Sequence, residues 1–139
     1  MHIRFGARHV IYLVVAGGAF LFSNALLAGE ADVVAATVTK LPDGSYHFDV
    51  TVAHADTGWD HYANVWQVVG PDGVVLGERE LMHPHVEEQP FTRSLSGVNI
   101  PADIKSIIIR AGDLVHGYGG QEVTLGLPSE AGKSVSSIK

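Results

Sequence analysis

The stretch SYHFDVTVAH, residues 45–54, alternates apolar and polar side chains with a period of two. Tyr46, Phe48, Val50 and Val52 fall on one side, and the three residues between them are polar. This period is typical of a β-strand with one buried face. Because His54 shares the parity of the apolar residues, we expect its side chain to point inward as well.

On both sides of this stretch, short apolar runs are separated by turn signals, and no run shows the 3.6-residue period of an amphipathic helix. Pro-Asp-Gly at 42–44 and again at 71–73 predicts two tight turns. The expected strands are 32–40, 45–54, 62–69, 74–81, 91–95, 104–110 and 122–127.

Seven short strands, with Trp66 in the third, predict an all-β, seven-stranded sandwich of the immunoglobulin or fibronectin III type. The chain has no cysteine, so the disulfide of antibody domains is missing and the match rests on strand count and spacing. A jelly roll or a small barrel is the alternative.

The first 28 residues have the layout of a secretory signal peptide: Arg4 and Arg8, then an apolar run at 10–22, then small residues. We expect cleavage after Ala28 or Ala31, with an uncleaved anchor as the alternative because 10–27 is nearly long enough to span a bilayer. The sandwich would occupy 29–127. Residues 128–139, rich in Ser, Lys and Gly, are expected to be a disordered tail.

Composition narrows the functional classes. Of 9 basic residues, Arg4 and Arg8 leave with the signal peptide, so 7 remain against 15 acids and the formal charge becomes −8. This charge argues against nucleic acid and anionic membranes as partners. We expect a periplasmic or secreted protein with no stable membrane insertion, no lipid on cysteine and no thiolate metal site.

Histidines gather in three loops. If successive strands alternate in direction, the loops after the second, fourth and sixth strands share one end: HADTGWDH (54–61), MHPHVEEQP (82–90) and AGDLVHGYGG (111–120). These loops hold five of the six histidines after residue 28, and the opposite loops hold none. Imidazole is a common ligand of Cu(II) and Zn(II). We therefore predict a site for one of these metals, with His83, His85 and His116 as ligands and His54 or His61 completing the set.

His83 and His85 point to the same side if their segment is extended, as the residue before a proline prefers. Nearby acids would fix the imidazole tautomers by accepting a hydrogen bond from the ring nitrogen that does not bind the metal. These acids are Asp56, Asp60, Glu87, Glu88 and Asp113. The simpler alternative is a set of hydrogen-bonded loop histidines without metal.

Aromatic residues at the same end support a second hypothesis. Trp59, Tyr62 and Tyr118 flank the histidines and either close the core or anchor a partner. The alternative function is thus a metal-free interaction module of the cell envelope that binds a protein or a glycan.

Enzymatic activity is not expected. Ser94 and Ser96 lack a nucleophile-elbow motif, and adjacent Glu87 and Glu88 would point to opposite sides of an extended segment. The glycines at 117–120 lack the strand and helix that flank a phosphate loop, so nucleotide binding is discarded as well.

The blocks HADTGWDHYANVW (54–66), LMHPHVEEQPFTRSLSGV (81–98) and HGYGG (116–120) resemble those of a family of small exported bacterial proteins. The resemblance covers most of the expected domain and implies a small periplasmic domain; it assigns no activity and no ligand. The chain differs from periplasmic copper chaperones, whose sites use several methionines, because Met82 is the one methionine after residue 28. A Cu(I) carrier is therefore not expected.

Overall fold

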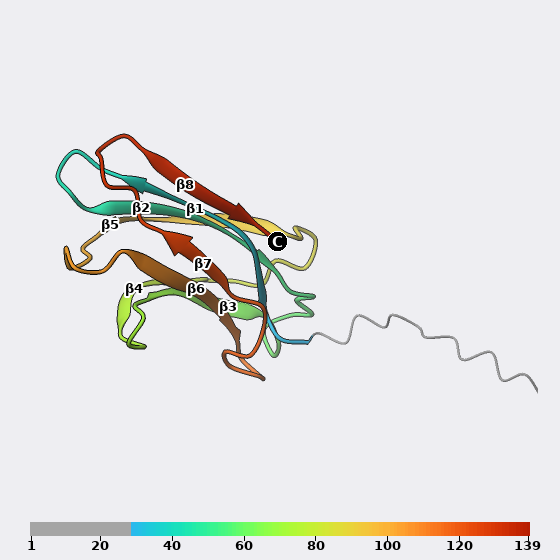
Figure 1. Ribbon diagram of the computed structural model, residues 1–139. Helices are drawn as coiled ribbons and strands as arrows, with labels where there is room; N and C mark the ends of the chain where they lie inside the picture. Colours follow the sequence, from blue (N-terminus) through green and yellow to red (C-terminus); the bar gives the residue numbers. More distant parts are fainter. Residues whose placement is uncertain (1–28) are drawn as a thin grey trace, which may run out of the picture.

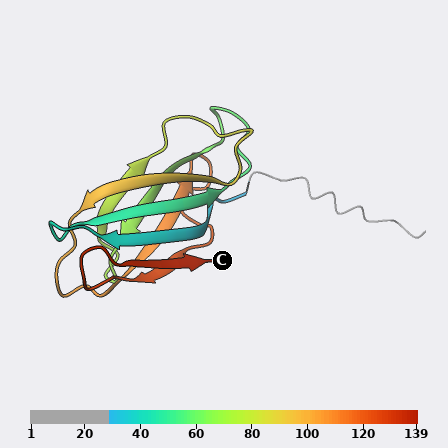
Figure 2. The same ribbon diagram turned by 90° about the horizontal axis from the view of Figure 1, so that it is seen from above.

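Two four-stranded antiparallel sheets pack face to face in this computed structural model, which describes residues 29–139 (Figure 1, Figure 2). The predicted signal peptide, residues 1–28, lies outside them. One sheet has the order β5-β2-β1-β8 and the other β4-β3-β6-β7. The strands are β1 (Asp32–Lys40), β2 (Tyr46–Ala53), β3 (Ala63–Val69), β4 (Val75–Glu80), β5 (Phe91–Val98), β6 (Ser106–Asp113), β7 (Val123–Gly126) and β8 (Ser134–Ile138).

The prediction of a β-sandwich is confirmed, and residues 29–139 contain no helix. All seven predicted strands are present, but the fold has eight. The largest shifts in bounds are at β5, which continues to Val98, and at β6, which continues to Asp113. Asp113 therefore sits at a strand end rather than in a loop.

The prediction of a disordered tail at 128–139 is wrong for its second half. Residues 134–138 form β8, which pairs antiparallel with β1 from Ala35↔Ile138 to Thr39↔Ser134. Val135 packs against the hydrophobic core, and the hydroxyls of Thr37 and Ser136 hydrogen bond at 2.8 Å. The composition is polar because the other face of this strand is exposed to solvent.

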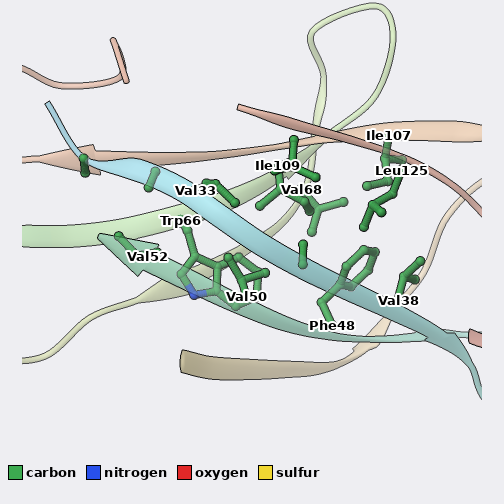
Figure 3. Packing of buried hydrophobic residues seen from close by; sticks show 14 of the residues in the cluster. Val33, Val38, Phe48, Val50, Val52, Trp66, Val68, Ile107, Ile109 and Leu125 are labelled. Carbon is green, nitrogen blue, oxygen red and sulfur yellow. The ribbon is translucent and has the colours of Figure 1, made fainter. Parts of the chain in front are cut away.

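The core lies between the sheets and follows the alternation that the sequence predicts. Every second residue of β2, from Tyr46 to Val52, is buried. Phe48, Trp66 and Ile109 are fully buried, and Figure 3 shows their side chains together with those of neighbouring valines. Each such side chain contributes about 1.5–3 kcal/mol by leaving water. The core thereby fixes the two sheets, and with them the strand ends.

The connections alternate between the two ends of the sandwich. The tight turns at 42–45 and 70–74 lie at one end, where Gly44 and Gly73 adopt φ of 87° and 84°, values that favour glycine (Figure 1). The loops 54–62, 81–90 and 114–122 lie at the opposite end (Figure 1). Gly29 is at this end too, because its carbonyl oxygen contacts the His54 ring. This is the end at which the histidines were expected.

Candidate metal centre

His54 follows directly after strand β2, at the end of the sandwich. Its side chain points inward, as its position in the alternating pattern predicts. Its side chain is fully buried, and its Nδ1 lies 2.5 Å from Asp56 Oδ1. Its Nε2 lies 2.9 Å from the carbonyl oxygen of Gly29. Both ring nitrogens of His54 therefore face oxygen atoms.

Asp56 is the buried carboxylate that holds this end together. Its Oδ1 also accepts a hydrogen bond from the Ala63 backbone NH at 2.9 Å, and its Oδ2 accepts one from the His85 NH at 2.7 Å. The loop after β2, the start of β3 and the loop after β4 are thus tied to one side chain. Asp56, which the sequence predicts as a partner of a ligand histidine, thus lies behind His54.

A second buried carboxylate, Asp113, contacts the side chains of two more histidines. Its Oδ1 lies 3.0 Å from His61 Nε2 and 3.0 Å from His116 Nδ1. The backbone NH groups of Val115 and His116 also donate to Oδ1, each at 2.9 Å. In contrast, Asp113 Oδ2 is buried and makes no hydrogen bond within residues 29–139.

The hydrogen bonds around Asp113 decide its ionisation. Burial raises the pKa of this carboxyl, but the backbone hydrogen bonds from His116 and Val115, together with the His116 side chain, outweigh burial and lower the pKa below its usual value. Asp113 is therefore a carboxylate at neutral pH, with one oxygen that has no protein partner among the described residues.

Three potential metal ligands, two histidines and Asp113 itself, lie close together at this end. One ligand atom each from His54, His61 and Asp113 lies within 4.8 Å of the others. The ring centroids of His54 and His61 are 4.8 Å apart, and those of His61 and His116 are 5.0 Å apart. His116 is thus adjacent to the group on its more exposed side.

His83 and His85 form a second group, outside the set of ligand atoms described above. Their rings are 4.5 Å apart, and the buried His85 ring stacks on Phe91 at 3.9 Å. Arg93 Nη2 donates to His85 Nε2 at 2.9 Å, and the Arg93 guanidinium also pairs with Glu88. His85 Nδ1 is buried without a hydrogen bond in the described part of the chain and lies 3.9 Å from Asp56 Oδ2.

The environment of His85 disfavours the protonated form of its imidazole. Burial lowers the pKa of this imidazole, the neighbouring Arg93 lowers it further, and His83 adds to the effect. The acids Glu88 and Asp56 act in the opposite direction without reversing it. The neutral ring therefore accepts the Arg93 hydrogen bond and packs as an aromatic group.

The predicted aromatic residues lie around the same end with different roles. Trp59 is 67% exposed, and its ring meets that of Tyr62 edge to face, with centroids 5.7 Å apart. The Arg110 guanidinium lies 4.4 Å from the centroid of Tyr118. Gly112 permits this placement, because a Cβ at that position would lie 3.0 Å from the Tyr118 ring.

Burial raises the pKa of the Tyr118 hydroxyl, and nearby Glu78 raises it further against the opposing charge of Arg110. The remaining predicted acids, Asp60 and Glu87, are exposed at the loop surface.

Three residues of this end were not anticipated from the sequence: Arg93, Gln89 and Gly29. Gln89 links two loops by accepting from the His54 NH at 3.0 Å and donating to the His85 carbonyl at 2.9 Å. The one available signal was the position of Gln89 and Arg93 within the block that also contains His83 and His85. The contact of Gly29 with His54 could not be predicted from the sequence, because it depends on the path of the backbone before β1.

A cavity of about 710 Å³ opens beside His54. Gly29, His54 and Asp56 line it together with two further acids, Glu30 and Asp32. The apolar part of its wall comes from Ala53, Ala55, Val86 and Pro90. The lining therefore includes three acidic residues and the two residues of the Gly29–His54 contact.

Comparison with known proteins shows a similarity to a curated protein. The chain is 40% identical over 106 residues to a protein of Halomicrobium mukohataei named "Putative lipoprotein". The match covers 76% of this chain and 52% of the relative, so the chain spans about half the length of that protein. No family model matches the chain, and no solved structure matches it.

Within residues 29–139, no helix is long and apolar enough to cross a membrane.

Proposed function

We propose that this protein binds one divalent transition metal ion, Cu(II) or Zn(II), through His54, His61 and Asp113, with His116 as a further ligand. The proposal rests on one observation: ligand atoms of His54, His61 and Asp113, which come from three separate segments, lie within 4.8 Å of one another. Two imidazoles and a carboxylate form a common set for Zn(II), and imidazole nitrogen also suits Cu(II).

The neighbours of His54 and Asp113 are the groups expected around a bound metal ion. Asp56 holds His54 through Nδ1, as carboxylates hold metal-binding histidines, so Nε2, which faces the Gly29 carbonyl oxygen at 2.9 Å, is the nitrogen that would bind the ion. A metal ion beside Asp113 would also give its buried Oδ2 a partner, and a lone buried oxygen is costly without one.

His83 and His85 are assigned a structural role in this proposal. His85 is buried between Phe91, Arg93 and Asp56, and Arg93 already donates to its Nε2. A positive guanidinium beside this nitrogen opposes a second cation at the same point. We therefore assign the predicted metal site to three of the five predicted histidines.

We infer that the protein is exported and works in the cell envelope or outside the cell. The leader-like residues 1–28 support export. The relative from Halomicrobium mukohataei, which is named a lipoprotein, supports it independently. We propose a binding role without catalysis, because among residues 29–139 no serine or threonine hydroxyl hydrogen bonds to a ring nitrogen of these histidines.

We also assign the sandwich to the immunoglobulin or fibronectin III type. Strands β1, β2 and β5 share one sheet, whereas β3, β6 and β7 share the other, as strands A, B, E and C, F, G do in that fold. Trp66 on β3 is fully buried, like the tryptophan of strand C.

The test is calorimetric titration of the exported protein with Cu(II) and Zn(II), paired with its metal content after purification. We expect one ion per chain with a micromolar or tighter dissociation constant. His61→Ala should weaken binding by about ten-fold or more, since ligand-shell losses have at least this effect. His47→Ala is the matched control, because His47 also contacts a carboxylate, Asp49, but lies on a strand face. Equal binding by both variants would overturn the site.

A second candidate function is a metal-free interaction module for an envelope protein or glycan. Six of the nine large exposed hydrophobic residues among 29–139 lie in the three loops of this end: Trp59, Met82, Val86, Leu114, Val115 and Tyr118. Exposed aromatic residues among polar neighbours are common anchors of interfaces. A chelator separates the two functions: it should abolish the metal-dependent one and leave contacts through Trp59 unchanged.

A further inference from the structure

The residues just after the expected leader belong to the folded domain. Ala31 is fully buried and forms part of the core. Its carbonyl oxygen runs so close to Gly120 that a Cβ at Gly120 would lie 2.0 Å away. The next residues are also fixed, since Val33 donates to the Gln121 carbonyl at 2.8 Å. Cleavage after Ala31 would remove a core residue, whereas cleavage after Ala28 would keep it.

Cleavage after Ala28 would create an amino terminus beside His54. The Gly29 carbonyl oxygen is 2.9 Å from His54 Nε2, the nitrogen that Asp56 leaves available. A neutral imidazole has one N–H, so a neutral His54 can donate to only one of the two oxygens that it faces. A cation bound at Nε2 would be attracted by both the ring nitrogen and the Gly29 oxygen.

We propose that the leader is removed after Ala28 and that the new α-amino nitrogen of Gly29, with its carbonyl oxygen, binds the same metal ion as His54. This inference rests on the proposed function. An amine nitrogen resembles imidazole as a ligand of Cu(II) and Zn(II), and the two groups of one glycine can chelate one ion. The amine loses its proton when it binds the metal.

The charges and the space beside Gly29 agree with this role. Glu30, Asp32 and Asp56 line the cavity that Gly29 and His54 share. These acids favour a cation there. The cavity of about 710 Å³ beside Gly29 and His54 also leaves room for solvent ligands.

The experiment begins with the full chain, exported by a bacterial host, and the mass of the processed protein. We expect a chain that starts at Gly29. Transamination with pyridoxal phosphate then converts its α-amine to a carbonyl group and leaves the lysine amines intact. Titration with Cu(II) should show affinity about ten-fold lower or more after this treatment, a difference of about 1.4 kcal/mol, with an unchanged melting temperature.

A second variant keeps the amine but moves it. One glycine inserted between Ala28 and Gly29 displaces the α-amine by roughly 3.5 Å of chain, and it should weaken Cu(II) binding to a similar degree. Processing after Ala31, or equal Cu(II) affinity before and after transamination, would overturn the inference. If affinity is unaffected by transamination but falls in His61→Ala, the proposed metal site stands and only the role of Gly29 fails. If the untreated protein binds no Cu(II), the proposed function fails, and this inference with it.

Discussion

Asp56 is one of two buried carboxylates on which contacts at the histidine-containing end of the sandwich converge. Its carboxylate accepts from the His54 ring and from the backbone NH groups of Ala63 and His85. Hydrogen bonds to a buried charged group contribute about 1.5–3 kcal/mol each, more than those to neutral groups. The loss of this carboxylate should therefore loosen three segments at once.

We expect Asp56→Asn to lower the free energy of unfolding by about 2–4 kcal/mol, because an amide accepts through one oxygen and leaves a buried donor unpaired. Urea denaturation measures this. Asp60→Asn is the matched control, since Asp60 is exposed in the same loop, and it should change stability by about 0.5 kcal/mol or less. Similar losses in the two variants would contradict the role of Asp56.

His85 should make stability depend on pH. The folded protein lowers the pKa of its imidazole, first through burial and then through Arg93, so the unfolded chain binds more protons. The contribution is present above the ordinary value of 6.5 and is lost as pH falls below it.

We expect the free energy of unfolding to decrease as pH falls from above 6.5 toward the lowered pKa of His85, and the decrease to be smaller in His85→Gln. Urea denaturation at a series of pH values measures both. Glu88, Asp56, His83 and Arg93 face this ring and are unchanged in the variant. Identical slopes in the two proteins would exclude His85 as the source.

At the residue scale, the sequence predicted the inward orientation of His54 correctly, because strand parity alone sets its direction. It did not separate His83 and His85 from the other histidines. Their placement depends on the stack with Phe91 and on a guanidinium from β5, contacts that arise from the folded loop and not from residue spacing.

At the scale of elements, β8 is a strand that the composition of its segment did not indicate. Its polar residues suggested a tail, yet Val135 faces the core while Ser134 and Ser136 bond to threonines of β1. A short strand at a sheet edge needs only one apolar side chain to dock, which is too weak a pattern to recognise in the sequence. The seven other strands carry stronger alternation or longer apolar runs and were predictable.

Substitutions in β8 test its docking. We expect Val135→Asp to destabilise the protein by about 1–3 kcal/mol, because it places a charge against the core. Ser136→Asp, on the exposed face of the same strand, should change stability by about 0.5 kcal/mol or less. Thermal or urea denaturation compares them. If Val135→Asp leaves stability unchanged, the segment does not pack on the sandwich.

At the scale of the whole molecule, the strand order explains why one end carries the candidate ligands. Because chain direction alternates, the loops after β2, β4 and β6 must meet, and the contacts of Asp56 and Asp113 join them. The sequence predicted this convergence. It could not predict which ligand atoms meet, because that depends on the two buried carboxylates and on the position of Gly29.

The most direct measurement is a crystal structure of the exported protein grown with Zn(II), with an anomalous difference map at the zinc edge. We predict one strong peak at about 2.0–2.2 Å from His54, His61 and Asp113 ligand atoms. A map with no peak at this end of the sandwich, or with its peak between His83 and His85 instead, would contradict the proposed metal centre.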